Sequence, residues 1–291
     1  MVEEAVKSEI VNFDKEEGKI FYSHSKLWLY ESCPEAYKIK YIDKIPLEMP
    51  RGIELFLGES VHATLEWFYN RVKIGEIEEL DALINNYADY WKENFNLLNF
   101  RILKGGGPDH YFQKGVGFLI NYYLKNKPFA DNTLFTEKRI VFPVDQSQRY
   151  WIQGYVDRIT VDDKGIYHIH DYKTNEYMKK QEDLDSDRQL AFYHIGLKEI
   201  FGQDVRVKLV WHFLAHNHSV FSSRKQEALE NLKKETFELI KKIELTANWR
   251  ACGSKWCDWC TYKKENGGKL FAISDQIGKI KDFSLKGFLG N

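Results

Sequence analysis

Two aspartates and a lysine lie on neighbouring segments that have the composition of β-strands. Asp157 lies on the first segment, and Asp171 and Lys173 lie on the second, after a turn around Asp163. Strand alternation places Asp171 and Lys173 on one face, and the short turn brings Asp157 opposite His170 or Asp171. Two carboxylates at a strand end suit Mg²⁺ or Mn²⁺, which can activate water for attack on a phosphate. Surface ion pairs on a solvated hairpin are the alternative interpretation.

The residues around these charges resemble a known pattern. Gly-Tyr-Val-Asp157-Arg-Ile, a turn, and Ile-His-Asp171-Tyr-Lys173-Thr are similar to motifs II and III of the RecB-type PD-(D/E)XK nucleases. The resemblance implies that Asp157 and Asp171 bind a metal ion and that Lys173 is catalytic. It also implies that the backbone carbonyl of Tyr172 is a further metal ligand.

Two more segments resemble motifs of the same family. Gly58-Glu-Ser-Val-His62 is similar to its G-x-x-x-H helix, which implies that His62 is another metal ligand. Gln189-Leu-Ala-Phe-Tyr193 is similar to its Q-x-x-x-Y motif, whose two side chains share one helical face and position substrate or metal-bound water. Glu137 is a weaker candidate on the first predicted strand, where it lies either near the metal or on a solvated edge.

The four cysteines form a separate constellation, with Cys33 far in sequence from Cys252, Cys257 and Cys260. This layout resembles the RecB-type nucleases that carry a [4Fe-4S] cluster, among them the CRISPR-associated adaptation nucleases and the AddB helicase-nucleases. The chain lacks that family's last cysteine and has Cys252 upstream of the C-x-x-C pair instead. The resemblance favours iron–sulfur, but zinc would also accept four thiolates. A site that has lost its cluster, with four unrelated thiols, is the remaining alternative.

The elements that must position these residues follow from hydrophobic periodicity and from turn residues. Helices are predicted at Ser25–Tyr41 with an interruption near Pro34, and at Gly58–Val72, Leu80–Asn96, Tyr111–Lys125, Leu184–Phe201 and Arg224–Ala247. Strands are predicted at Thr133–Val144, Tyr150–Val161, Ile166–Lys173, Val205–Leu214 and His218–Ser222. This order predicts an α/β fold with a mixed central sheet flanked by helices. The resemblance implies a restriction-endonuclease-like core with an N-terminal helical insertion and a cysteine-bearing C-terminal tail.

The 291 residues are expected to form an extension at 1–22, one nuclease domain at 23–262 and a tail at 263–291, with a helical subdomain at about 75–130. The formal net charge of −1 does not favour a protein that coats nucleic acid. The acidic N-terminus lacks the features of a signal peptide, and no apolar run is long enough to cross a membrane. We therefore expect an intracellular, cytoplasmic protein, with a prokaryotic or viral origin plausible.

The resemblance implies a metal-dependent DNA exonuclease that acts on single strands or free ends with Mg²⁺ or Mn²⁺. One alternative is a catalytically inactive module that binds nucleic acid or a protein partner and keeps the nuclease fold. Intact Asp157, Asp171 and Lys173 argue against that alternative, because a binding module does not need to bring them together. The same chemistry on RNA is the other alternative.

Overall fold

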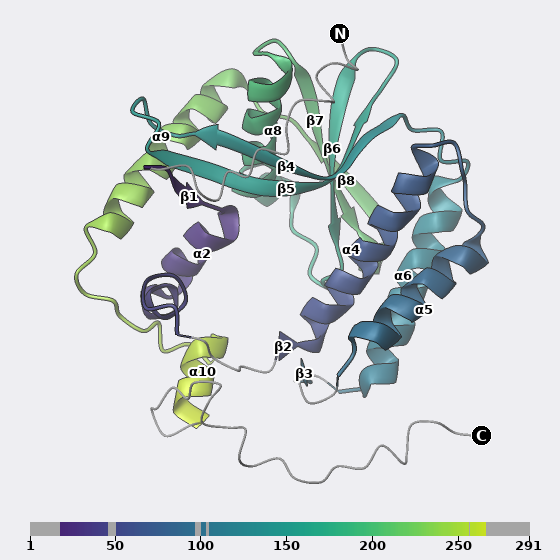
Figure 1. The fold of residues 1–291 in the computed structure, drawn as a ribbon, viewed down its shortest axis with the longest axis horizontal. Helices are drawn as coiled ribbons and strands as arrows, with labels where there is room; N and C mark the ends of the chain where they lie inside the picture. The colour runs from purple at the N-terminus through teal and green to yellow at the C-terminus, as the bar shows by residue number, and fades with distance from the viewer. Residues whose placement is uncertain (1–17, 46–50, 97–99, 103–104, 256, 266–291) are drawn as a thin grey trace.

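The computed structural model describes residues 18–45, 51–96, 100–102, 105–255 and 257–265. Within them, six strands form one mixed sheet (Figure 1). Strand β5 is central because β4 runs antiparallel along it, while β1 pairs with its first residues and β6 with its last. The order continues through β7, parallel to β6, and ends at β8. The strands are β1 (Ile20–Tyr22), β4 (Thr133–Pro143), β5 (Tyr150–Val161), β6 (Ile166–Lys173), β7 (Arg206–Phe213) and β8 (His218–Ser222).

One face of this sheet is covered by helices α8 (Arg188–Phe201), α9 (Gln226–Glu244) and α2 (His24–Ser32). Helix α8 is buried over most of its length, and it contacts β4, β5, β6 and β7. The apolar side chains of Ile169 and Trp211 point into the same core. This packing removes a large apolar area from water and fixes α8 against the strands that carry the candidate site.

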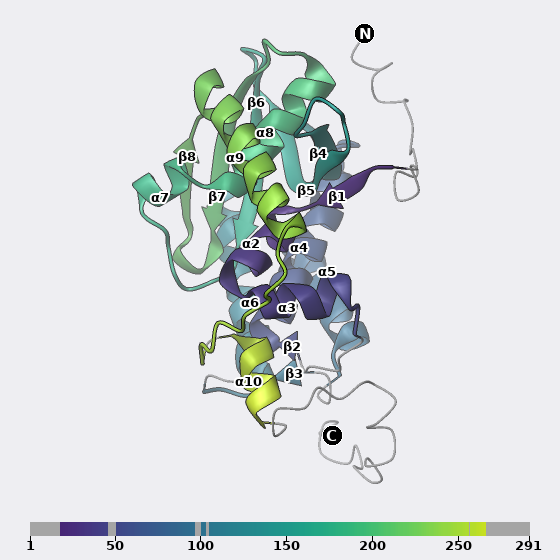
Figure 2. The ribbon, with the colours of Figure 1, turned by 90° about the vertical axis from the view of Figure 1, so that its left-hand side faces the viewer.

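Helices α4 (Ile53–Val72), α5 (Leu80–Asn94) and α6 (Pro108–Asn126) pack together and build a second core, which is rich in aromatic rings (Figures 1 and 2). Helix α4 contacts β4 and β5, and Tyr172 of β6 joins the same core. Successive residues of β6 therefore face different cores, with Ile169 toward α8 and Tyr172 toward α4 and α6. The predicted helical subdomain falls on α5 and α6, and the predicted domain boundaries stay a prediction.

The first and last described segments meet at one end of the molecule (Figure 2). Helix α3 (Pro34–Tyr37) and a π-helix (Lys38–Ile42) lie near α10 (Asp258–Glu265). Lys263 forms an ion pair with Glu35 at 2.6 Å, and Arg101 pairs with Asp258. Arg101 belongs to the short parallel pair β2 (Arg51–Gly52) and β3 (Phe100–Arg101). These contacts join α10 to α3 through Lys263 and to β3 through Asp258.

The structure confirms the predicted mixed α/β architecture and corrects individual elements. The predicted helix Leu184–Phe201 is two helices, α7 (Gln181–Asp185) and α8, because Asp187 caps α8 by accepting from the Gln189 N–H at 2.9 Å. The interruption predicted near Pro34 is confirmed: α2 ends at Ser32 and α3 begins at Pro34, which has no N–H to continue the first helix. Helix α4 begins at Ile53 rather than Gly58, and β1 was not predicted as a strand.

Parts of the predicted N-terminal extension (1–17) and of the predicted tail (266–291) lie outside the described residues. Among the helices that the structure describes, none combines the length and apolar composition needed to cross a membrane.

Candidate active site

Strands β5 and β6 separate at Asp157. Their ladder ends at the pair Arg158–His170, so the register places Asp157 across from Asp171 rather than His170. Beyond that pair, the carboxylate of Asp157 accepts the backbone N–H of Tyr172 at 2.7 Å. A side chain thus replaces the main-chain partner where the strands diverge, which fixes the Asp157 carboxylate at the opening between them.

His62 reaches this opening from α4. Its Nε2 lies 2.7 Å from the carbonyl oxygen of Tyr172, and its Nδ1 lies 3.5 Å from the Asp157 carboxylate. Burial opposes a charge on the imidazole, but the carboxylates of Asp157 and Asp171 outweigh it and raise the pKa of His62 to about 9. Helix α4 can approach β6 closely because the residue one turn before His62 is Gly58, which faces Thr174. A Cβ on Gly58 would lie 3.2 Å from the Thr174 Oγ1.

Glu137 joins His62 and Asp157. The flanking ladder pairs place Glu137 of β4 across from Asp157, but Glu137 itself has a left-handed backbone with φ of 44°. One ligand atom from each of these three side chains lies within 4.8 Å of the others. Burial, reinforced by the charge of Asp157, raises the pKa of Glu137 to about 7. Of the two interpretations of Glu137, the geometry favours the one that places it at the site.

Asp171 and Lys173 form the other half of the opening. Asp171 is 2% exposed, and its carboxylate lies 2.7 Å from Lys173 Nζ. Lys173 Nζ also donates to Gln189 Oε1 at 3.0 Å, and Gln189 Nε2 donates to the Tyr193 hydroxyl at 3.1 Å. Burial raises the pKa of Asp171, and the nearby ammonium of Lys173 opposes that shift. The five predicted catalytic side chains therefore converge at one place in the structure.

Gly154 has a steric role at the site that sequence reasoning did not identify. A Cβ on Gly154 would lie 2.6 Å from Tyr193 Cε1, which is closer than real Cβ contacts. The Tyr193 ring can therefore approach β5 this closely only because position 154 has no side chain. The available signal was a glycine inside a segment that otherwise reads as a strand, which often marks a close approach.

Taken together, the site offers the carboxylates of Asp157, Asp171 and Glu137, the imidazole of His62 and the carbonyl oxygen of Tyr172. Such a set, mostly of hard oxygen donors, fits Mg²⁺ or Mn²⁺, and the one imidazole is better suited to Mn²⁺ than to Mg²⁺. The raised pKa values of Glu137 and Asp171 also fit a cation, since a cation would stabilise the charged forms of these two carboxylates. Lys173 stands beside these ligands as a cation that can face a substrate anion.

The four cysteines also converge, at the end of the molecule where α3 meets α10. Their Sγ atoms all lie within 4.8 Å of one another, with 3.9 Å from Cys33 to Cys260 and 3.7 Å from Cys252 to Cys260. Cys33 is buried and Cys252 is exposed. Cys252 thus joins the other three cysteines although it precedes the C-x-x-C pair, whereas the related pattern has its last cysteine after that pair.

Comparison with known proteins gives a family and a fold. The model of the "PD-(D/E)XK nuclease superfamily" matches residues 22–264. A crystal structure from Eubacterium rectale, described as a "Putative exonuclease", superposes with a TM-score of 0.51 at 12% identity and covers 94% of this chain and 98% of that one. A second structure, SSO0001, is 15% identical over 89% of this chain and 90% of its own, with a TM-score of 0.38. The search of curated proteins finds no match.

Proposed function

The chain belongs to the PD-(D/E)XK nuclease superfamily, and from that premise we propose that it is a metal-dependent deoxyribonuclease that hydrolyses phosphodiester bonds. The observation that carries the proposal is the meeting of Asp157, Asp171 and Lys173 where β5 and β6 separate. A strand opening lined by carboxylates and flanked by a lysine has little value for stability, because it concentrates like charge. The same arrangement can bind a divalent cation and the phosphate of a substrate.

In this proposal Asp157, Asp171, Glu137, His62 and the carbonyl of Tyr172 hold Mg²⁺ or Mn²⁺. The bound ion supplies a Lewis acid that polarises the phosphate and lowers the pKa of water. Held in place by Asp171, Lys173 presents its ammonium to the charge that develops on the phosphate.

Gln189 and Tyr193 act as positioning residues in this proposal. Gln189 accepts from Lys173 Nζ and donates to Tyr193, so the chain of contacts restricts where the ammonium can point. Residues whose own conformations are fixed by neighbours hold a reacting group more accurately than free side chains do. We assign both residues to the orientation of Lys173 and of the substrate.

For the substrate we propose single-stranded DNA or DNA with free ends, cut as an exonuclease. Two exposed rings support unpaired bases as the binding partner. Tyr155 precedes Asp157 by two residues and is 54% exposed, and Tyr177 follows Lys173 by four residues and is 66% exposed. Exposed aromatic rings beside a phosphate-handling site can stack on bases without sequence preference. The Eubacterium rectale protein of similar fold is itself described as a "Putative exonuclease".

The test is digestion of end-labelled single-stranded DNA by the purified chain with Mg²⁺ or Mn²⁺, beside its Asp171→Ala variant. Loss of a metal ligand removes several kcal/mol of charge stabilisation, so the variant should be at least about 100-fold slower. Asp89→Ala, which removes an exposed carboxylate on α5, is the matched control and should cut normally. Matched duplex and RNA strands report substrate class, and the product ladder reports polarity.

Equal cleavage rates for the wild type and Asp171→Ala would contradict the assignment of Asp171 to the active site, because the activity would then come from a contaminating nuclease. No cleavage of any strand by the wild type with either ion would instead favour a module that binds nucleic acid without cutting it.

We further propose that the cysteine site holds a single tetrahedral ion, zinc, rather than the [4Fe-4S] cluster that the sequence resemblance favours. A zinc ion with Zn–S bonds of about 2.3 Å places its four sulfurs about 3.8 Å apart. The Sγ–Sγ separations of 3.7 Å from Cys252 to Cys260 and 3.9 Å from Cys33 to Cys260 support that arrangement. A four-iron cluster lies between its thiolates and holds them farther apart than one ion does.

A further inference from the structure

A cleft of about 640 Å³ opens on the face of the sheet that looks away from the candidate active site. Its floor is formed by side chains of β5 to β8, and its walls are the end of α6 with the following turn and the β5–β6 hairpin turn. Strand alternation separates the two sites, since His170 and Arg158 face the cleft while Asp171 and Asp157 face the opening. The polar residues on this floor include Arg158, Thr160, His170 and His212.

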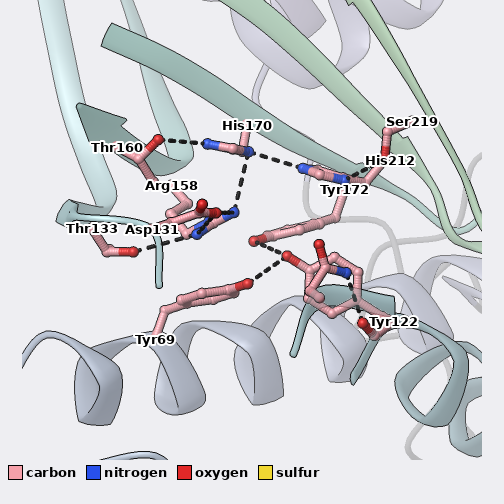
Figure 3. A network of polar contacts seen from close by, with 11 residues as sticks. Tyr69, Tyr122, Asp131, Thr133, Arg158, Thr160, His170, Tyr172, His212 and Ser219 are labelled. Atoms are coloured by element: carbon pink, nitrogen blue, oxygen red, sulfur yellow. Dashed lines mark hydrogen bonds and ion pairs between the residues drawn. The ribbon is translucent and has the colours of Figure 1, made fainter. Parts of the chain in front are cut away.

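Arg158 is the unusual residue of this cleft, because it is a guanidinium with 1% exposure (Figure 3). Its Cζ lies 3.8 Å from the centre of the Tyr69 ring. Its Nη atoms contact Thr133 Oγ1 at 3.3 Å and His170 Nδ1 at 3.2 Å. Within the described chain, its Nε is buried without a hydrogen-bond partner. A cation this deeply buried is costly unless a close anion compensates it.

The carboxylate that the structure places near Arg158 compensates it only weakly. Asp131 Oδ2 lies 3.4 and 3.5 Å from the two Nη atoms, whereas a good charge-assisted hydrogen bond is about 2.7–2.9 Å long. The Asp131 side chain is also 58% exposed, so water screens its charge. Asp131 is therefore a loose counter-ion that a better anion can displace.

Arg158 supplies the positive charge on the floor of the cleft, and its guanidinium can only donate hydrogen bonds. His170 Nδ1 therefore accepts from Arg158 at 3.2 Å, which makes His212 Nε2 the donor of its 2.9 Å contact with the same Nδ1. His170 Nε2 then carries the ring hydrogen and donates to Thr160 Oγ1 at 3.0 Å. Thr160 then keeps its own hydroxyl hydrogen for another acceptor.

We propose that this cleft binds a small phosphate-bearing anion, whose oxygens accept from the Arg158 guanidinium and the Thr160 hydroxyl and displace Asp131. Phosphate suits the planar guanidinium, which donates through two parallel N–H groups. Small-molecule sites have volumes of about 300–1,000 Å³, so the cleft has room for more than a bare ion. A phosphate monoester of mononucleotide size fits that space, and inorganic phosphate shares its chemistry.

The experiment is calorimetric titration of the intact chain with inorganic phosphate and, separately, with a deoxynucleoside monophosphate. Buffer without added Mg²⁺ or Mn²⁺ keeps the result independent of the nuclease proposal. Tighter binding of the monophosphate than of phosphate identifies an organic ligand, and equal binding identifies the free ion. If neither ligand binds at millimolar concentration, the proposal is overturned.

Three variants locate the binding. Asp131→Asn removes the competing carboxylate and should tighten binding about 2- to 5-fold, the size of an exposed ion pair. Arg158→Met should weaken it at least about 10-fold, as loss of a buried charge partner does. Asp89→Asn, on the surface of α5, should leave it unchanged.

Asp131→Asn tests the anion-binding proposal even if Arg158→Met does not fold, because Asp131 is exposed and its substitution should not disturb the core. Binding that is unchanged or weaker in Asp131→Asn overturns the assignment to Arg158.

Discussion

Lys173 is held by two acceptors of different kinds. The Asp171 carboxylate pairs with its charge at 2.7 Å, and the Gln189 amide oxygen fixes its direction at 3.0 Å. Burial works against the charged ammonium, but the Asp171 carboxylate overcomes it and raises the pKa of Lys173. The lysine is therefore charged at neutral pH and cannot serve as a general base. We therefore expect Lys173 to act through its charge, by stabilising negative charge on the phosphate.

That assignment predicts the behaviour of Lys173→Met. The variant should bind Mn²⁺ at least as well as the wild type, because it loses a cation beside the metal ligands. Cleavage should fall by about 100- to 1,000-fold, the cost of removing one preorganised charge donor. Mn²⁺ calorimetry and cleavage rates check the two halves separately, with Lys234→Met on α9 as the exposed control. Unimpaired cleavage would show that Lys173 has no catalytic role.

Metal binding should also depend on pH. Without metal, His62 with a pKa of about 9 and Glu137 with a pKa of about 7 hold protons at pH 6. An ion can bind these groups only by displacing those protons, so affinity must rise with pH. Between pH 6 and pH 8 we expect Mn²⁺ affinity to increase at least about 10-fold.

Calorimetry in buffers of different ionisation enthalpy counts the protons released. His62→Asn should release fewer protons than the wild type at pH 7.5, and it should show a shallower pH dependence. Equal Mn²⁺ affinity at both pH values would contradict the assignment of these two ligands.

At the scale of elements, the position of α8 decides how the site is assembled. Tyr193 of α8 contacts the sheet at Gly154 of β5. Gly196 lets the α8 backbone approach β4, because a Cβ on Gly196 would lie 2.8 Å from the Ile140 Cβ. The same helix begins at Arg188 because Asp187 caps it. The separation between helix and sheet therefore sets where Gln189 stands relative to Lys173.

Gly154→Ala should push Tyr193 away from β5. We expect a loss of about 1–3 kcal/mol in the free energy of unfolding, typical of overpacking, together with slower cleavage at an unchanged Mn²⁺ affinity. The matched control is Gly117→Ala in α6, where a Cβ meets nothing within 4 Å and should slightly stabilise the helix. Chemical denaturation and rate measurements on both variants check the prediction. A Gly154→Ala protein as stable and active as the wild type would show that Tyr193 is not held by this contact.

At the scale of the whole molecule, the cysteine site joins segments that are more than two hundred residues apart. Its four cysteines come from the junction of α2 and α3, from the segment that leads into α10, and from α10 itself. Nearby, the Trp249 ring stacks on Tyr37 with centroids 5.8 Å apart. A metal ion there would tie the last described helix to the start of the fold, and its binding free energy would add to local stability.

Removal of that metal should loosen this end and leave the sheet folded. With a chelator, or in Cys33→Ser, we expect the Tm to fall by about 5 °C, which corresponds to roughly 2 kcal/mol of unfolding free energy for a chain of this size. We also expect faster proteolysis between Trp249 and Tyr262. Ser32→Ala is the control at the neighbouring exposed position. Elemental analysis should find one zinc per chain. A brown protein with iron and an absorption band near 400 nm would instead support the cluster.

Much of this protein was predictable from local patterns. The five main strands after residue 130 begin and end within two residues of their predicted bounds, because β-branched and aromatic runs bounded by turn residues are a short-range signal. The mixed fold and the family followed from motif order and spacing, which the match over residues 22–264 confirms. The residues in those motifs were predicted individually, and the structure brings them together.

Other features depend on contacts between distant segments, and no local pattern contains them. Glu137 could be a solvated charge or a site residue until the register of β4 on β5 placed it across from Asp157. The separation of β5 from β6, which lets Asp157 accept the Tyr172 N–H, is a property of the pair of strands rather than of either sequence. The buried charge of Arg158 likewise depends on the helices that cover it. The sequence determined which groups the chain carries, and tertiary packing decided which of them share a site, because register, burial and charge compensation exist only between segments.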